Sequence, residues 1–335
     1  MTHHSTLPRT LLVVFVGFAL VSSSRAQAAE AYKWTAPDGS VVYSDKPQPS
    51  QAEPEPATPA APTSPAAPLQ RETAPKVASN TDEVLELSGV KPQLAIAPTK
   101  IAGEFKPKSP LNAEDAAALE QILARNFAGD RLYTQLRGEF KKRADGKRLS
   151  EVAQWLKSPL GQKITALEIA AGTEADAGRR MVAFAPGGRG GPPASRIALM
   201  EKIDWTAGVT DGALESTLAV ARAMAMAINR ALPPDERQAA AQIERQIQQL
   251  RGQSRAKLAQ ATITFMLYQY RTLEEDELQQ YADFLASDAG HWYSATMSKA
   301  MNRTIATAAQ RSATEIVRAI PPPRWSGGAA ASPRN

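Results

Sequence analysis

Apolar residues recur at helical spacing through most of the chain from about Ser79 onward. Asn112 opens a run whose apolar residues share one helical face, and the apolar stretch 214–232 is long enough for a central helix. Three consecutive prolines at 321–323 would end the last helix, because proline cannot continue one. The pattern predicts an all-α fold for this part of the chain.

Glycine and proline mark the expected helix boundaries. Gly89 has the character of a residue that ends a helix in the left-handed conformation, and Pro92 suits N1, the first position of the next helix. Pro233 should start a long polar-faced segment that reaches about residue 270 and that Gly252 could break. Residues 272–275, Thr-Leu-Glu-Glu, are typical of a capping box at a helix start.

Two parts of the chain carry the same pattern. The pattern of residues 85–90 recurs at 204–209, and that of 155–161 recurs at 284–290. An insertion of about ten residues aligns the two copies. The repetition predicts two tandem helical repeats, 79–184 and 196–320, packed as a helical bundle and joined by a Gly/Pro-rich linker, 185–195. Whether the repeats form one domain or two is left open by the sequence.

The second half of the repeat predicts a tight helical hairpin. Ser158 and Ser287 are suitable N-caps for the helix that follows each of them. Gly161 and Gly290 lack a Cβ and so permit close approach of a neighbouring backbone. An aromatic residue three positions before each serine would pack beneath the turn. This motif is interpreted as a structural device and not as a ligand site.

The repeated pattern, Phe/Trp-Leu-x-Ser-Pro-x-Gly after an upstream Leu-x-x-Ser/Thr-Gly-Val helix, resembles an uncharacterised all-helical domain common in exported bacterial proteins. The resemblance covers roughly residues 80–178 and 196–318. The second copy departs from the pattern, with Asp288 in place of proline and Ala289 before the glycine. The resemblance implies no catalytic residues.

The first 28 residues are typical of an export signal. Arg9 precedes an apolar run from Leu11 to Val21, and Ala26-Gln27-Ala28 has the small-x-small pattern of a cleavage site. The apolar run is shorter than the ~20 residues of a membrane-spanning helix, although an uncleaved anchor is the alternative. We therefore expect a secreted, periplasmic protein that begins at Ala29 and has no transmembrane segment.

Residues 29–47 predict a β-hairpin, because two runs rich in aromatic and β-branched residues flank Pro-Asp-Gly. Trp34 and Tyr43 are candidate anchors for docking it. The pattern Tyr-Lys-Trp, Asp-Gly, Tyr-Ser-Asp-x-Pro resembles a small uncharacterised domain that follows the signal in many bacterial envelope proteins. That resemblance implies a Gram-negative cell envelope. Residues 48–78, dominated by Pro and Ala, predict a disordered linker, and 321–335 a disordered tail.

Few catalytic arrangements are open to this composition. Cysteine is absent, which excludes thiol nucleophiles and thiolate metal sites, and His291 is the one histidine beyond the signal. The acidic run 274–277 fits the dipole of a first helical turn, and the Gly-rich loop 186–193 lacks the context of a phosphate loop. Trp155, Phe284 and Trp292 are expected in the core. We assign no catalytic, cofactor-binding or metal-binding residue and expect no cofactor.

Charge gives little indication of a partner. The chain has 39 Lys and Arg against 34 Asp and Glu, and the predicted signal removes two of the basic residues. The densest basic runs, 106–108 and 141–143, are interpreted as solvated loops or helix ends, so no nucleic-acid partner is expected.

Three functions remain open from the sequence alone. The first is a non-enzymatic envelope protein that binds or scaffolds, with an unknown envelope protein as its partner. The second is a carrier of an apolar, lipid-like ligand, whose cavity would be lined by Met224, Met226 and Met266. The third is a hydrolase that uses carboxylates alone, with two acids facing one cleft. The first is favoured because histidine and cysteine are so scarce.

Overall fold

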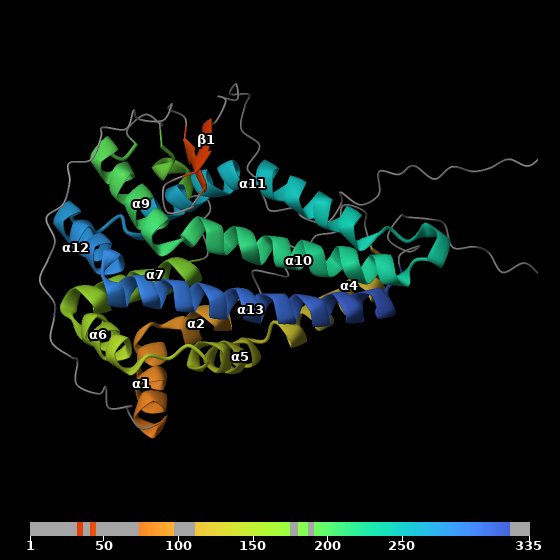
Figure 1. Ribbon diagram of the computed structural model, residues 1–335, viewed down its shortest axis with the longest axis horizontal. Helices are drawn as coiled ribbons and strands as arrows, with labels where there is room; N and C mark the ends of the chain where they lie inside the picture. Colours follow the sequence, from red (N-terminus) through yellow and green to blue (C-terminus); the bar gives the residue numbers. More distant parts are fainter. Residues whose placement is uncertain are drawn as a thin grey trace, which may run out of the picture. The chain divides into compact units, whose positions relative to one another are not determined.

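The computed structural model describes residues 32–35, 41–44, 74–96, 111–174, 180–186 and 191–321. These residues are mostly helical, and the chain divides into two units, of which one holds all the described helices and the other the two strands (Figure 1). The predicted signal 1–28, the linker as far as residue 73, the centre of the Gly-rich loop at 187–190, and residues 322–335 lie outside the described residues.

Two short strands make up the described part of the smaller unit. Strand β1, Tyr32–Thr35, pairs antiparallel with β2, Val41–Ser44, so that Tyr32 lies opposite Ser44 and Thr35 opposite Val41. The predicted Pro-Asp-Gly turn between them lies outside the described residues, as do the side chains of the strands.

The helical unit begins with a group of short helices. In chain order they are α1 (Ala74–Leu87), α2 (Val90–Ala95), α4 (Ala113–Asn126), α5 (Gly129–Lys141), α6 (Gly146–Lys157) and α7 (Pro159–Thr173). A short 3₁₀ turn, η1 (Val182–Phe184), follows them. Helix α1 starts five residues before the predicted Ser79, and Pro75 falls in its first turn, where a missing N–H costs nothing.

The rest of the unit consists mainly of long helices. They are α9 (Ala194–Ala207), α10 (Val209–Ala231), the 3₁₀ turn η2 (Pro234–Glu236), α11 (Ala240–Gln269), α12 (Glu275–Ala286) and α13 (Asp288–Ala319). Helices α10 and α13 run side by side through the middle of the unit (Figure 1). The apolar stretch 214–232 therefore is a central helix, as its pattern predicts.

The cores of the unit do not separate at the predicted linker 185–195. The largest core cluster joins α1, α2, α4, α5 and α6 to α13, whose Ala300, Ala308 and Ile316 are buried in it. A second cluster joins α9, α11 and α12 to α7, through the buried Ile164. The last helix of each predicted repeat thus packs into a core made mainly by the other repeat.

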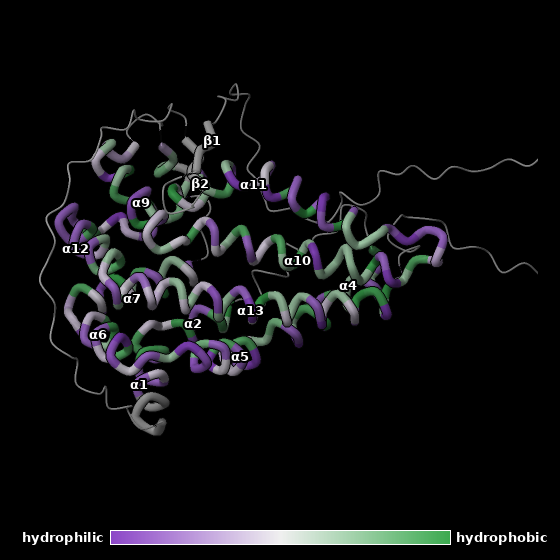
Figure 2. Tube along the Cα trace, viewed as in Figure 1, coloured by the Kyte–Doolittle hydropathy of each residue, from purple (hydrophilic) through white to green (hydrophobic). Residues whose placement is uncertain are grey.

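Small residues allow α10 and α13 to approach closely. On α13 the buried positions include Ala300, Thr304 and Ala308, and along α10 apolar and polar positions alternate (Figure 2). Ser216 on α10 donates a 2.6 Å hydrogen bond to Asn302 Oδ1 on α13. Bulkier apolar side chains of both helices belong to the largest core cluster, among them Met224, Ile228, Met301 and Ile305.

Local signals predicted several helix ends well. Asn112 caps α4, because its Oδ1 accepts the Asp115 N–H at 2.8 Å. Helix α5 buries its apolar face, including Leu136 and Phe140, and α13 ends at Ala319, two residues before the prolines.

The predicted capping box at 272–275 is wrong in its register. The N-cap is Glu274, and Glu277 at N3 accepts the Glu274 N–H at 2.9 Å. Leu273 is buried, and it belongs to the preceding turn, because its N–H donates to the Tyr270 carbonyl at 2.9 Å. The guanidinium of Arg196 donates to the carbonyls of Tyr270 and Leu273, which holds this turn outside the helix.

Two other details differ from the expected boundaries. Gly252 does not break α11, which is continuous over thirty residues, and a Cβ at this position would meet open space. Pro92 is the third residue of α2 and not the first. No helix among the described residues is long and apolar enough to cross a membrane.

Candidate functional site

The two motif turns have the same geometry. Ser158 caps α7, with its Oγ accepting the Gly161 N–H at 3.0 Å and donating to the Trp155 carbonyl at 2.6 Å. Ser287 caps α13 in the same way, with 3.1 Å to Gly290 and 2.6 Å to the Phe284 carbonyl. Each serine therefore links the end of one helix to the start of the next.

Glycine is required at the third position of both helices. A Cβ added at Gly161 would collide with the Trp155 carbonyl oxygen, and one added at Gly290 would collide with that of Phe284. The upstream glycines are also alike, since Gly89 and Gly208 have φ of +63° and +66°, the left-handed region that glycine adopts freely.

The aromatic residues of the two motifs contact one another. The rings of Trp155 and Phe284 stack with centroids 4.4 Å apart and planes inclined by 7°. The Tyr281 ring is also nearly parallel to that of Trp155, with the ring centroids 6.4 Å apart. The sequence predicted that both residues lie in the core, but it gave no indication that the two rings contact each other.

Two ion pairs link the helices of one motif to the helices of the other. Arg148 on α6 donates two hydrogen bonds to Asp288 on α13, at 2.8 and 3.0 Å. Lys163 on α7 pairs with Glu277 on α12 at 2.6 Å. Arg148 and Glu277 each lie ten residues before their capping serine. These pairs are largely exposed, so each contributes little stability on its own.

A small cavity lies beside the aromatic stack. It has a volume of about 40 Å³, and Trp155, Glu168, Tyr281 and Tyr293 are among its lining residues. Such a volume is of the order of one or two water molecules, and it is far too small for a lipid chain. The cavity therefore gives no support to a carrier function.

Glu168 is the acidic group of this cavity. Tyr270 donates a 2.8 Å hydrogen bond to Glu168 Oε1, and Tyr281 lies 3.4 Å from the same oxygen. Burial raises the pKa of the Glu168 carboxyl, and the two hydroxyl donors oppose that rise. Burial also raises the pKa of Tyr270 and Tyr281 well above the usual range, with the charge of Glu168 adding to it.

A single carboxyl group with phenol neighbours is a poor constellation for hydrolysis. General acid–base hydrolysis by carboxylates needs a second acid across a cleft that admits substrate. The residues that line this cavity include one acid, Glu168, and the space is too small for a substrate.

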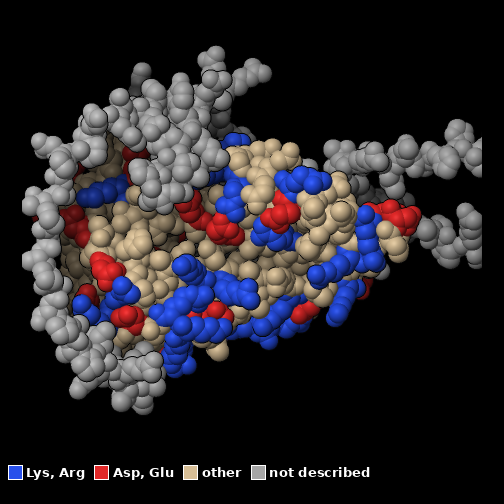
Figure 3. Space-filling view, in the orientation of Figure 1, with Lys and Arg blue, Asp and Glu red and all other residues tan. Residues whose placement is uncertain are grey.

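Cations gather on the exposed side of α13. Lys299, Arg303, Arg311 and Arg318 are all exposed and fall within about a third of the helix circumference at 100° per residue. The residues exposed between them are uncharged, and none of the four forms an ion pair with another described residue. Figure 3 shows Lys and Arg gathered along α13 and α5 on the face in view. We call these four residues the α13 stripe.

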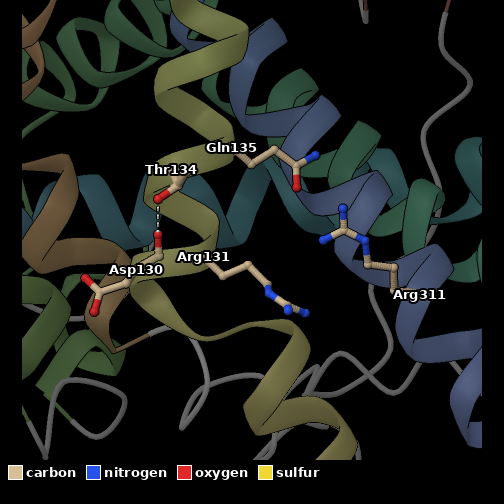
Figure 4. Close-up of a pocket in the computed structure, with 5 residues that line it drawn as sticks. All are labelled: Asp130, Arg131, Thr134, Gln135 and Arg311. Atoms are coloured by element: carbon tan, nitrogen blue, oxygen red, sulfur yellow. Dashed lines mark hydrogen bonds between the residues drawn. The ribbon is translucent and has the colours of Figure 1, made fainter.

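An open hollow of about 440 Å³ lies where the α13 stripe meets α5. Its lining residues are Asp130, Arg131, Thr134, Gln135 and Arg311. Figure 4 shows the Arg131 guanidinium and the Gln135 amide directed toward Arg311, whereas the Asp130 carboxylate points to the other side. The Thr134 hydroxyl donates to the Asp130 carbonyl at 2.8 Å.

The residues weighed from the sequence are spread over the unit. His291 is exposed in the first turn of α13, and the acidic run 274–277 lies at the start of α12. Trp292 packs edge-on against Phe140 at 6.0 Å. Met224, Met226 and Met266 pack in three different apolar clusters and do not line one cavity.

No sequence signal pointed to Glu168 or to the α13 stripe. A glutamate on a helix is ordinarily exposed, and the cations of the stripe are four to eight residues apart, so that they form no dense run. Helical periodicity applied to charge would have grouped the stripe on one face. Among the described residues, no group of three His, Cys, Asp or Glu could hold a metal ion.

Comparison with known proteins covers the N-terminal part of the chain. Residues 18–73 match a family described as a domain of unknown function, DUF4124. The match spans the two strands and excludes all the helices from α1 onward. No curated protein and no solved structure matches the chain.

Proposed function

We propose that this is an exported, non-enzymatic binding protein of the cell envelope, whose helical unit attaches to anionic phospholipid surfaces through the α13 stripe. In this proposal the signal 1–28 is cleaved and the chain lies in the periplasm. The β-hairpin of residues 29–47 and a linker that ends before α1, at residue 73, then form a separate N-terminal module. The uncharacterised N-terminal domain family is compatible with this and indicates no activity.

We further propose that the helical unit consists of two copies of one repeat. Support comes from the equal geometry of the Ser158 and Ser287 caps, the left-handed conformation of Gly89 and Gly208, and matching helix contacts. Helix α1 packs against α6 as α9 does against α12. The repeats would build a rigid support for the exposed side of α13.

The observation that carries the binding proposal is the α13 stripe itself. From Lys299 to Arg318 the helix rises about 28 Å at 1.5 Å per residue, and its most exposed residues there include four cations and no acid. Glu315, whose side chain is 34% exposed, is paired with Arg125. Cations spread along one side of a helix suit a flat anionic surface, where each Lys or Arg contributes ~1 kcal/mol. The uncharged residues between them are polar, so the contact would be electrostatic and shallow.

The test is sedimentation of the mature protein with vesicles of phosphatidylglycerol in phosphatidylcholine, compared with pure phosphatidylcholine. We expect binding to the anionic vesicles alone and its loss at high salt, because salt screens exposed charges. The double variant Lys299→Gln/Arg303→Gln should bind roughly 25-fold more weakly, from ~1 kcal/mol for each of two charges.

A matched control separates the stripe from net charge. Arg245→Gln/Lys257→Gln removes two exposed cations of α11 that form no ion pair with another described residue. This variant should bind like the wild type. Equal loss in both double variants would show that only net charge matters and would overturn the proposal, as would equal binding to neutral vesicles.

A further inference from the structure

The hollow between α5 and α13 is lined by two arginines, Arg131 and Arg311, neither of which forms an ion pair with another described residue. Arg131 donates a hydrogen bond to Asn126 Oδ1 at 3.3 Å, which is a neutral partner. The nearest acid on α13, Glu315, lies within electrostatic range of Arg131 but is paired with Arg125 at 2.5 Å.

The position of Arg131 is fixed by the end of α4. Asn126 is fully buried, and its amide donates to the Ile122 carbonyl at 3.2 Å, so its Oδ1 is directed at the Arg131 guanidinium. The hydrogen bond orients the guanidinium without neutralising it. An arginine that is oriented in advance loses less entropy when it binds an anion.

We propose that this hollow is a phosphate-binding site, in which Arg131 and Arg311 hold one phosphate group from opposite sides and the Gln135 amide donates a further hydrogen bond. Two guanidinium forks offer several N–H donors and match the oxygens of a phosphate better than the two oxygens of a carboxylate. All three residues line the hollow, and in Figure 4 the side chains of Arg131 and Gln135 extend from α5 to the side on which Arg311 lies. The Asp130 carboxylate, which would repel an anion, is turned away from them.

This inference rests on the proposed function, because it names the point at which the α13 stripe would recognise a phosphate headgroup and not charge alone. Arg311 belongs to both the stripe and the hollow, whereas Lys299 and Arg303 belong to the stripe only. The two proposals therefore predict different results for variants of the same helix.

The direct probe is inorganic phosphate, titrated into the mature protein by calorimetry at constant ionic strength, with acetate as the carboxylate probe. We expect phosphate to bind and acetate to bind more weakly. Arg131→Gln and Arg311→Gln should each reduce the phosphate affinity about tenfold, as expected for a lost hydrogen bond to a charged group. The matched control Arg303→Gln, two turns away on the same helix, should leave phosphate affinity unchanged.

Competition identifies the source of the phosphate. If the site takes a lipid headgroup, inorganic phosphate should release the protein from phosphatidylglycerol vesicles more effectively than chloride at equal ionic strength. Phosphate that binds in the hollow without releasing the protein would assign the site to a soluble phosphate compound.

The possible failures are distinguishable. If phosphate does not bind, or if Arg303→Gln weakens it as much as Arg311→Gln does, the phosphate site is wrong while vesicle binding through the stripe can still hold. If the Lys299→Gln/Arg303→Gln variant binds vesicles normally, the proposed function is wrong whatever the hollow binds. Circular dichroism of each variant checks that loss of binding does not come from unfolding.

Discussion

Trp155 and Phe284 stack face to face at 4.4 Å, although 129 positions separate them in the chain. Each ring occupies the position three residues before a capping serine, so the contact joins the same place in the two motifs. Ring stacking contributes beyond the area that it buries. This stack therefore ties the two motif turns together inside the unit.

Removing either ring should destabilise the helical unit. We expect Trp155→Ala and Phe284→Ala each to cost about 3 kcal/mol, near the low end for aromatic truncation because both side chains are only partly buried. Denaturant unfolding measures the change. Trp205→Ala is the matched control, since this indole is 75% exposed and its loss should change stability by no more than about 0.5 kcal/mol. Equal stability of Trp155→Ala and Trp205→Ala would contradict the role of the stack.

Replacing glycine by alanine should destabilise the protein at two positions and stabilise it at a third. Gly161→Ala and Gly290→Ala force a Cβ into a backbone carbonyl and should each cost ~1–3 kcal/mol. Gly252→Ala in α11 meets open space and should stabilise the helix by up to about 1 kcal/mol, because alanine is the better helix former. Thermal and denaturant melts of the three variants measure the sign and size of each change in stability. A neutral Gly161→Ala would show that the turn tolerates more room than its geometry indicates.

Glu168 should make stability fall as the pH rises. Burial raises its pKa above the ordinary 4.5, so the folded protein retains the proton to higher pH than the unfolded chain does. The stabilisation is complete below the ordinary value and is lost as the pH rises toward the raised one. Glu168→Gln keeps an oxygen that accepts from Tyr270 and cannot ionise. The stability of wild type relative to this variant should therefore decrease with rising pH above 4.5.

The control for this titration has the opposite sign. The Lys142 ammonium beside Glu139 lowers the pKa of that carboxyl. The advantage of wild type over Glu139→Gln should be present above 4.5 and vanish as the pH falls through the lowered value. Parallel pH profiles for wild type and Glu168→Gln would show that Glu168 is not held protonated by its surroundings.

Export should leave a shortened chain. We expect the protein recovered from the periplasmic fraction of a Gram-negative host to begin at Ala29, as the Ala-Gln-Ala site predicts. N-terminal sequencing reads this directly. A chain that still begins at Met1 and sediments with membranes would favour an uncleaved anchor.

The sequence predicted those features of the helical unit that depend only on residues close together in the chain. The caps at Asn112, Ser158 and Ser287 depend on a side chain and a backbone N–H three residues apart, so the sequence contains the whole interaction. The capping box failed by two residues because a distant side chain, Arg196, holds the carbonyls before it. Local sequence could not indicate that competition.

The candidate sites depend on contacts across the fold. The Glu168 cluster joins α7 to tyrosines about 100 residues later, and the hollow joins Arg131 to Arg311 across two helices. Helical spacing predicts which residues share a face, but not which helices become neighbours. The contact between Trp155 and Phe284 was hidden for the same reason.

The exchange of last helices has a consequence for a chain that contains only one repeat. Helix α13 completes the core of the first half, and α7 contributes Ile164 to that of the second. In a polypeptide with only one such repeat, part of the core would be exposed to solvent, and the last helix would have no core to pack against. Two copies could satisfy each other by swapping that helix around a twofold axis, with identical aromatic rings meeting on the axis. Under the proposed repeat, a chain with one copy should therefore be stable only as a homodimer.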